Sequence, residues 1–303
     1  MDSLGKLFAL SFSICFPFIL GSCNQKIIED TDWQLVASGF SFPEGPAWDG
    51  KGVLYVSNCY SNMIAKIEGA LVDKFVTASE STFEKTNGLV VSKNGDIFAC
   101  DFGKGAILKV TPAGEVSVLV SGFNGKRLNR PNDINFAKNG NLYFTDPKSY
   151  GAEKADGRVF YHDFQSGQTR LVADNMDFPN GLAMSPLANK LYVCESAKNR
   201  VVRFDAAKNG QLTNMQTFVE LPGGDPDGIE FDVKGNLYVA HFGSGTVFVI
   251  SPQGEILHQI KTPGKKPSNL EFGEKDMKTL FLTEDETNSV YKLQVGVPGY
   301  RAY

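Results

Sequence analysis

Short buried strands alternate with polar turns along this chain, and one arrangement of them returns six times. Each copy opens with an acidic or amide residue at the head of a buried strand, followed by a turn and a second strand that ends on a polar side chain. The head residues recur at intervals of roughly 40–50 residues. They are Glu44, Asn87, Asn132, Asn180, Asp227 and, less cleanly, the Ser268-Asn269 pair. A repeat of this length that contains several strands is typical of a β-propeller, with one repeat per blade.

The second strand of every copy is mostly apolar, and many of its residues are β-branched or aromatic. These strands are expected at 53–56, 96–99, 142–145, 190–193, 236–239 and 279–282. Asn94-Gly95 and Asn139-Gly140 precede two of them, and Asn-Gly between two such runs is a strong hairpin signal. Further runs, such as 105–110 and 116–120, supply outer strands. The simplest prediction is an all-β, six-bladed β-propeller with four antiparallel strands per blade.

One internal match predicts how the ring closes. Residues 34–48 align without gaps onto residues 170–184. The leading residues of the second copy belong to the outermost strand of a blade. Residues 34–37 should therefore be the outermost strand of the last blade, whose other three strands come from 269–293. A ring closed by both ends of the chain leaves no open sheet edge.

The head residues predict a cation site on the ring axis. Asn-Gly and Asp-Gly alone usually mark turns, but here separate turn signals follow each first strand, and proline precedes four of the six heads, which stiffens the loop that positions them. Carboxylate and amide oxygens that converge on one axis repel each other unless a cation lies among them. Calcium is the natural occupant, because it binds ~6–8 oxygen ligands of mixed kind.

A second column of polar residues ends the second strands. It consists of Asn58, Asp101, Asp146, Glu195, His241 and Glu284. These side chains either line the mouth of the site or form a solvated rim, and the sequence leaves both alternatives open.

The N-terminal residues are predicted to be a targeting segment rather than part of the folded domain. An apolar run at 7–20 follows Lys6 and is too short to span a membrane comfortably. Leu20-Gly21-Ser22-Cys23 resembles the bacterial lipobox, although an ordinary cleaved signal is the alternative. We therefore expect a lipoprotein signal peptide at 1–22, a tether at 23–32 and a single propeller domain at 33–303. The mature protein would be exported and anchored to a bacterial membrane by a lipid on Cys23.

Composition narrows the possible partners. The chain is 42% hydrophobic, enough for a sizeable core, and its net charge of −4 comes from interspersed acids and bases. This pattern gives no indication of nucleic-acid binding. Cys59, Cys100 and Cys194 are an odd number beyond the N-terminal segment, so they are expected to be buried thiols rather than a disulfide framework. Oligomeric state is not predicted.

Several motifs together resemble the gluconolactonase/regucalcin family, also called the senescence marker protein family, of six-bladed calcium-dependent lactonases. The likeness covers nearly the whole propeller region. Its most specific pieces are Pro43-Glu44-Gly45-Pro46, Arg130-Pro131-Asn132-Asp133, Tyr143-Phe144-Thr145-Asp146-Pro147, Pro179-Asn180-Gly181-Leu182 and Pro226-Asp227-Gly228.

The resemblance implies roles for particular residues. Glu44, Asn180 and Asp227 would bind the metal, and Asp227 would also be the general base. Arg130, Asn132 and Asn87 would contact the substrate, and Asn132 could instead be a metal ligand. The segment 147–157 differs across the family and would shape the pocket, which makes Tyr150 a candidate substrate contact. The pair at 268–269 departs from the pattern and receives no role.

The implied activity is calcium-dependent hydrolysis of a sugar lactone, such as gluconolactone, to the aldonic acid. No Gly-x-Ser-x-Gly motif is present, so a covalent acyl-enzyme is not expected. Two alternatives remain at this point. One is a related propeller hydrolase of aryl esters or phosphotriesters, to which Tyr60, Phe102 and Phe242 could give an apolar mouth. The other is a non-enzymatic binding propeller in which calcium is only structural.

Overall fold

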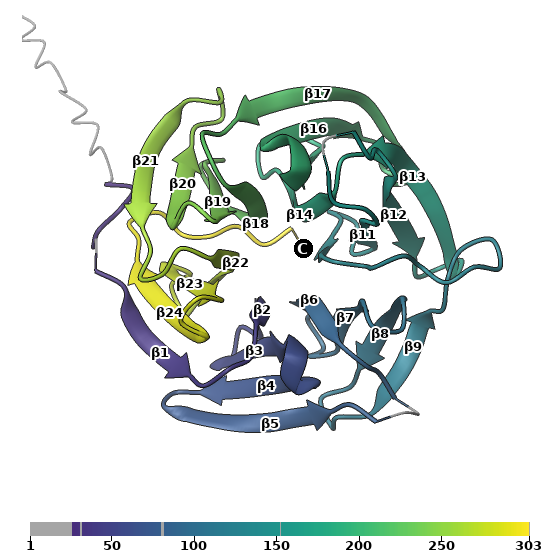
Figure 1. Ribbon diagram of the computed structural model, residues 1–303, viewed down its shortest axis with the longest axis horizontal. Helices are drawn as coiled ribbons and strands as arrows, with labels where there is room; N and C mark the ends of the chain where they lie inside the picture. Colours follow the sequence, from purple (N-terminus) through teal and green to yellow (C-terminus); the bar gives the residue numbers. More distant parts are fainter. Residues whose placement is uncertain (1–25, 31, 80–81, 152, 303) are drawn as a thin grey trace, which may run out of the picture.

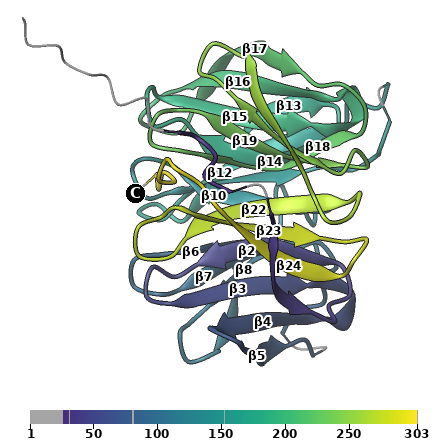
Figure 2. The ribbon, with the colours of Figure 1, turned by 90° about the vertical axis from the view of Figure 1, so that its left-hand side faces the viewer.

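A computed structural model describes residues 26–30, 32–79, 82–151 and 153–302 of the chain. Its strands form six four-stranded antiparallel sheets arranged around one axis (Figure 1). From the side, the sheets stand next to one another around the ring (Figure 2). The predicted six-bladed β-propeller is therefore confirmed. The predicted signal peptide at 1–22 and the Cys23 anchor lie outside the described residues.

Each blade takes consecutive strands from the inside of the ring outward. Blade 1 contains β2 (Pro43–Trp48), β3 (Val53–Asn58), β4 (Met63–Glu68) and β5 (Leu71–Thr77). Blade 2 contains β6 (Thr86–Val91), β7 (Ile97–Asp101), β8 (Ala106–Val110) and β9 (Val116–Val120). Blade 3 contains β10 (Ile134–Phe136), β11 (Leu142–Asp146), β12 (Gly157–Asp163) and β13 (Gln168–Met176).

The second half of the ring follows the same order. Blade 4 contains β14 (Pro179–Met184), β15 (Lys190–Glu195), β16 (Arg200–Ala206) and β17 (Leu212–Glu220). Blade 5 contains β18 (Asp225–Phe231), β19 (Leu237–Phe242), β20 (Thr246–Ile250) and β21 (Ile256–Lys261). Blade 6 contains β22 (Pro267–Gly273), β23 (Thr279–Glu284), β24 (Ser289–Gln294) and β1 (Gln34–Ser38). Two short 3₁₀ helices, η1 (Cys59–Ser61) and η2 (Ser196–Lys198), follow β3 and β15.

The hydrophobic core lies between neighbouring blades. Tyr143 and Val159 of blade 3, for example, pack with Leu182 and Val193 of blade 4 in one buried cluster. The inner strand β2 is buried along its whole length, whereas the outer strand β5 is mostly exposed. The nearly continuous apolar character of the second strands in the sequence follows from this burial on both faces.

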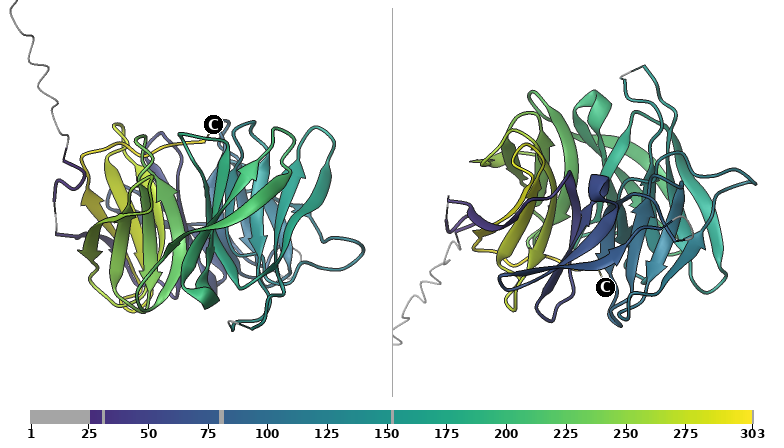
Figure 3. Two further views of the ribbon diagram at one scale, coloured as in Figure 1. Left: turned by 90° about the horizontal axis from the view of Figure 1, so that it is seen from above. Right: turned by 60° about the horizontal axis from the view of Figure 1, so that its bottom comes forward.

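The ring closes as the internal match predicted. β1 pairs antiparallel with β24, so blade 6 combines the N-terminal strand with three C-terminal strands. Part of the segment expected to be a tether also packs on this blade. Ile28 is buried, forms an isolated bridge with Val295, and belongs to a hydrophobic cluster with Leu293. The chain after Gln294 then crosses one face of the ring toward its centre (Figure 3).

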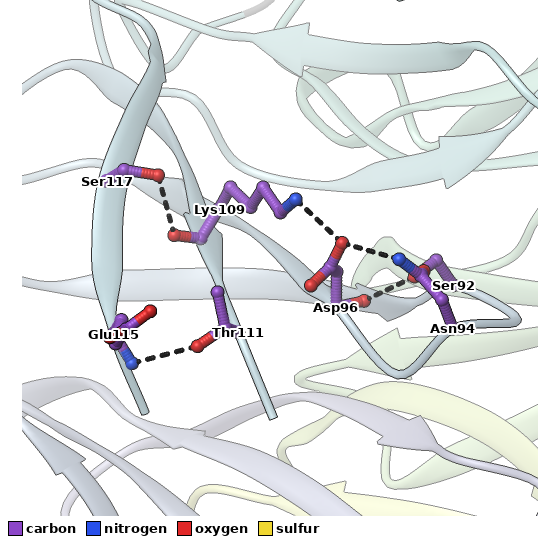
Figure 4. A network of polar contacts seen from close by, with 7 residues as sticks. All are labelled: Ser92, Asn94, Asp96, Lys109, Thr111, Glu115 and Ser117. Atoms are coloured by element: carbon purple, nitrogen blue, oxygen red, sulfur yellow. Dashed lines mark hydrogen bonds and ion pairs between the residues drawn. The ribbon is translucent and has the colours of Figure 1, made fainter. Parts of the chain in front are cut away.

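Side chains reinforce the turns between strands. In the β6–β7 turn, Asn94 Nδ2 donates to Asp96 Oδ2 at 2.8 Å, and Ser92 Oγ donates to the Asp96 carbonyl at 2.9 Å (Figure 4). Lys109 of β8 pairs with the same Asp96 carboxylate at 2.8 Å. The Asn94-Gly95 signal in the sequence therefore marks a real hairpin that is held by its own polar side chains.

Two smaller findings complete the fold. Cys59, Cys100 and Cys194 are buried and free, which confirms the prediction of buried thiols. Within the ranges that the structure describes, no helix has the length and apolar character needed to cross a membrane.

Candidate functional site

A pocket of about 200 Å³ opens at one end of the ring axis. The structure brings every predicted site residue to this pocket. These residues are Glu44, Asn87, Arg130, Asn132, Tyr150, Asn180 and Asp227. They come from five of the six blades, so the convergence follows from the repeat and from ring closure rather than from nearness in sequence.

Local irregularities in the inner strands present the head residues to the pocket. In blade 1, Glu44 pairs with Ser57, and the register then shifts before Ala47 pairs with Tyr55. Equivalent shifts occur at the heads of blades 2, 4 and 5. A β-bulge of this kind re-aims a side chain at the end of a strand. Gly45 has φ +49°, and a Cβ there would lie 2.4 Å from the Asn87 carbonyl oxygen, so only glycine lets the two blades meet.

Two carboxylates at the floor of the pocket are poorly compensated. Glu44 is 3% exposed and Asp227 is 9% exposed. Burial raises the pKa of Glu44 to about 8, with a further contribution from the charge of Asp133. Burial and then the nearby Glu44 charge raise the pKa of Asp227 well above its usual value. Both shifts record the cost of holding negative charge in a buried place without a counter-ion.

The donor set fits a hard cation. Among the described residues, no ion pair involves Glu44 or Asp227, and the buried Oδ1 atom of Asn87 has no hydrogen-bond partner. The same part of the chain contains no group of three His, Cys, Asp or Glu side chains placed to hold a metal. A cation here would therefore need the amide oxygens of Asn180 and its neighbours as well as the two carboxylates. Calcium accepts such a mixture, whereas zinc favours nitrogen and sulfur ligands.

Two residues beneath the floor received no role in the sequence analysis, although Asn269 belongs to the sixth head and Asp133 to one of the family motifs. Asp133 and Asn269 are both buried, in blades that lie opposite each other in the ring. The Asn269 side chain hydrogen-bonds to Glu44 and to Asp133 and lowers the pKa of each. Burial is the larger effect for Asp133 and raises its pKa to about 6. Asn269 thus connects Glu44 at the floor of the pocket with Asp133 beneath it, a contact that its imperfect repeat motif concealed.

The polar column at the ends of the second strands neither lines the pocket nor forms a solvated rim. We call its six residues the anchor residues, and all are buried: Asn58, Asp101, Asp146, Glu195, His241 and Glu284. In five blades the anchor accepts backbone N–H groups from the loop that precedes the head residue. Asp101, for example, accepts the N–H groups of Glu84 and Lys85 from this loop at 2.9–3.1 Å, and those of Gly103 and Lys104, which follow Asp101, at 3.2 Å.

The remaining anchors repeat this arrangement with one exception. Asn58 binds Ser41, Asp146 binds Arg130, Glu195 binds Asp177 and Glu284 binds Lys266, in each case through the backbone N–H at 2.7–2.9 Å. His241 in blade 5 instead contacts the side chains of Asn199 and Ser244. The anchors therefore fix the loops that carry the head residues, which makes them positioning residues.

The residues that follow the anchors are a second feature of the site, and among them only Phe102 and Phe242 were named from the sequence as candidates for an apolar mouth. Four of these residues line the pocket: Phe102, Pro147, Ser196 and Phe242. The equivalent residue of blade 6 is Asp285, which is buried, and both of its carboxylate oxygens lack a hydrogen-bond partner. Burial, followed by the Glu44 charge, raises the pKa of Asp285 to about 9. In the sequence, this set could have been identified by its position, because each member directly follows an anchor residue.

Two predicted substrate contacts lie at the pocket mouth. Asp146 Oδ1 accepts the Arg130 N–H at 2.8 Å, while the Arg130 side chain is exposed. The Tyr150 hydroxyl hydrogen-bonds to Asp225, and burial together with this contact raises the pKa of Tyr150 to about 12. Tyr150 therefore connects the loop of blade 3 with the loop that leads to Asp227.

A second, smaller cavity of about 80 Å³ lies farther along the inner strands, and the C-terminal segment helps to line it. Glu230 and Glu271 line it together with Asp133 and Asn269. Arg301 donates to the Trp48 carbonyl at 2.6 Å, and its charge opposes the effect of burial on the pKa of Glu271. Asp133 and Asn269 thus belong to the lining of this cavity, and Asn269 links it to Glu44 in the functional pocket.

Comparison with known proteins gives the family. The family described as the SMP-30/Gluconolactonase/LRE-like region matches residues 42–285. The chain belongs to this family. A gluconolactonase from Zymomonas mobilis is 34% identical over 84% of this chain and 79% of its own length. A diisopropyl-fluorophosphatase from Loligo vulgaris is 27% identical over 86% of this chain and 91% of its own length.

A solved structure agrees with this assignment. A gluconolactonase from Xanthomonas campestris superposes with a TM-score of 0.79 at 29% identity, over 89% of this chain and 91% of the other. The named relatives are hydrolases, and the predicted membership of the gluconolactonase family is confirmed.

Proposed function

We propose that this protein is a calcium-dependent lactonase that opens sugar lactones, such as gluconolactone, to the corresponding aldonic acids. The observation that carries the proposal is the pair of buried, uncompensated carboxylates, Glu44 and Asp227, at the floor of an open pocket. Membership of a family that contains a gluconolactonase 34% identical to this chain supports the reaction class.

The cation would be held by Glu44, Asn180 and Asp227, with Asn132 beside them. When bound, calcium supplies Lewis-acid polarisation of the ester carbonyl and stabilises negative charge on its oxygen. Its positive charge would also favour the ionised forms of Glu44 and Asp227, because it would offset the burial that raises their pKa values.

The chain's own groups account for the remaining steps. Asp227 accepts a proton from the attacking water as its oxygen bonds to the lactone carbonyl carbon. The acyl carbon–oxygen bond of the ring then breaks, and the ring oxygen takes up a proton to become a hydroxyl. Arg130, Asn132 and Asn87 orient the sugar oxygens on one side of the pocket, which holds the carbonyl over the floor.

The test is acid release from a panel of sugar lactones, corrected for spontaneous opening, in calcium and after chelation. Calcium-dependent turnover of aldonolactones is the expected result. Absence of turnover across the panel with calcium bound would overturn the proposed reaction and favour the non-enzymatic binding role. Turnover that persists unchanged after complete removal of divalent ions would overturn only the role of the cation.

We also propose that the protein is exported and anchored to a bacterial membrane through a lipid on Cys23. The apolar run at 7–20 and the Leu20-Gly21-Ser22-Cys23 motif support this placement. Metabolic labelling with a fatty acid should mark the wild-type chain but not Cys23→Ala. Equal labelling of both chains would refute the proposed anchor.

A further inference from the structure

Aromatic side chains are concentrated at the functional pocket. They make up 12% of the chain but contribute six of the fifteen residues that line the pocket. These six are Phe42, Tyr60, Phe102, Tyr150, Phe178 and Phe242, which together we call the aromatic collar. All six are half-buried or exposed, so their rings do not belong to the cores between blades. Their placement is therefore not explained by packing of the fold.

Two collar residues occupy strained backbone positions. Phe42 has φ +62° and Phe178 has φ +54°, in the left-handed region that costs a bulky residue about 1–3 kcal/mol. Backbone hydrogen bonds hold both conformations, because Cys59 donates to the Phe42 carbonyl at 3.1 Å and Ser196 donates to that of Phe178 at 3.2 Å. The same arrangement at two separate positions indicates that it is selected rather than accidental.

The fold itself does not require these phenylalanines. The same position, two residues before the head, is occupied in the other blades by Lys85, Arg130, Asp225 and Lys266. None of those four has a positive φ. Four blades thus form their inner strands without this strained backbone. The two phenylalanine rings are therefore explained by the pocket rather than by the fold.

Collar residues come from opposite blades of the ring. Phe42 packs edge-to-face on Tyr60, and Phe178 packs edge-to-face on Tyr150, both with ring centroids 5.2 Å apart. Phe42 and Phe178 come from blades 1 and 4, which are opposite in a six-bladed ring (Figure 1). Phe102 and Phe242 likewise come from the opposite blades 2 and 5. Apolar surfaces therefore flank the mouth on facing sides.

Two of the polar groups beside the collar already have partners within the protein. Ser196 Oγ already donates to the Pro226 carbonyl at 2.7 Å, and the Tyr150 hydroxyl is bound to Asp225. The polar groups left for a substrate, Arg130, Asn132 and Asn87, come from blades 2 and 3, which also contribute Phe102 and Tyr150 to the collar. A ligand that fills the collar sides gains apolar burial and edge-to-face contacts, while a hydroxyl placed there would lose its partners.

We infer that the site hydrolyses a second class of substrate, namely lactones whose ring carries an aryl or alkyl group, with that group bound in the aromatic collar. The inference rests on the proposed lactonase function and adds a substrate class to it. The reaction is the same: water adds to the carbonyl carbon, the ring acyl carbon–oxygen bond breaks, and the released oxygen takes a proton. The collar binds the apolar substituent, which cannot hydrogen-bond to the polar residues that orient a sugar.

The test compares two six-membered lactones, δ-gluconolactone and a phenyl-substituted δ-valerolactone, by acid release in calcium. The variants are Phe42→Leu with Phe178→Leu, and Phe164→Leu as the matched control. Phe164 is a partly exposed ring that packs on Phe98 and His162 and does not line the pocket. The double variant should lower kcat/KM for the phenyl lactone about tenfold more than for gluconolactone, while the control changes neither.

The outcomes separate the two proposals. Hydrolysis of gluconolactone without the phenyl lactone, or equal losses for both lactones in the double variant, overturns this inference and leaves the lactonase intact. Failure of both lactones overturns the proposed function together with it. If the double variant does not fold, Phe102→Leu with Phe242→Leu provides the same comparison from the other pair of opposite blades.

Discussion

The head residues and the anchor residues each form a ring of six polar side chains, one per blade, yet their surroundings differ. The Asp101 carboxylate accepts four backbone N–H groups, and the Glu195 carboxylate accepts the Asp177 N–H as well as Arg200. Among the described residues, by contrast, the Asp227 side chain makes no hydrogen bond. A buried carboxylate with protein partners stabilises the fold, whereas one without them is held ready for a ligand at a cost to stability.

The largest expected effect comes from neutralising a head residue. Asp227→Asn should lower kcat/KM for lactone hydrolysis by about 10²–10⁴-fold, because the base is lost. Its unfolding free energy in chelator should be unchanged or higher, since a buried charge beside Glu44 is removed. Enzyme kinetics and urea unfolding measure the two effects. A variant that kept near-full turnover with calcium bound would show that Asp227 is not the base.

Removing an anchor should act on stability instead. Asp101→Ala should lower the unfolding free energy by about 3 kcal/mol, because four backbone N–H groups lose their acceptor in a buried place. The folded fraction should keep calcium binding. Asp73→Ala, on the exposed outer strand β5, is the matched control and should be close to neutral. Equal stability of the two variants would refute the positioning role of the anchor.

The head residues and the anchor residues also show how much of the site could be predicted from the sequence. The repeat predicted the blades and the heads, and the internal match at 34–48 predicted the closing strand, because both depend on periodicity that the chain displays directly. The anchors stayed ambiguous because a polar residue at a strand end does not reveal its partners in a loop about 20 residues away. Asn269 was found only as an imperfect sixth head and Asp285 only as the residue after an anchor, and neither position reveals the interaction with Glu44 that ring closure creates.

A smaller effect should follow from the pKa shifts. Burial raises the pKa of Glu44 from its model-compound value of 4.5 to about 8, so the folded protein holds a proton that the unfolded chain has already released. Without calcium, the unfolding free energy should therefore fall as pH rises from 6.5 to 8, on the order of 1 kcal/mol.

In this pH window, His241 does not contribute to the pH dependence of the unfolding free energy. Burial lowers the pKa of His241 to about 4, so its neutral form stabilises the protein above pH 6.5 and that stability is lost only as pH falls below that value. Urea unfolding at several pH values in chelator and in calcium measures the slope. A slope that is absent in chelator, or equally steep in calcium, would contradict uncompensated charge at the head ring.

The most direct measurement is the calcium dependence of the unfolding temperature in three chains: wild type, Asp227→Asn and Asp101→Ala. A ligand that binds only the folded state raises this temperature, and the stabilisation grows with the logarithm of the ligand concentration divided by Kd. Calcium should raise Tm of the wild type and of Asp101→Ala by similar amounts and raise that of Asp227→Asn little. The same calcium shift in Asp227→Asn as in the wild type, or no shift in any chain, would contradict a cation site built by the head ring.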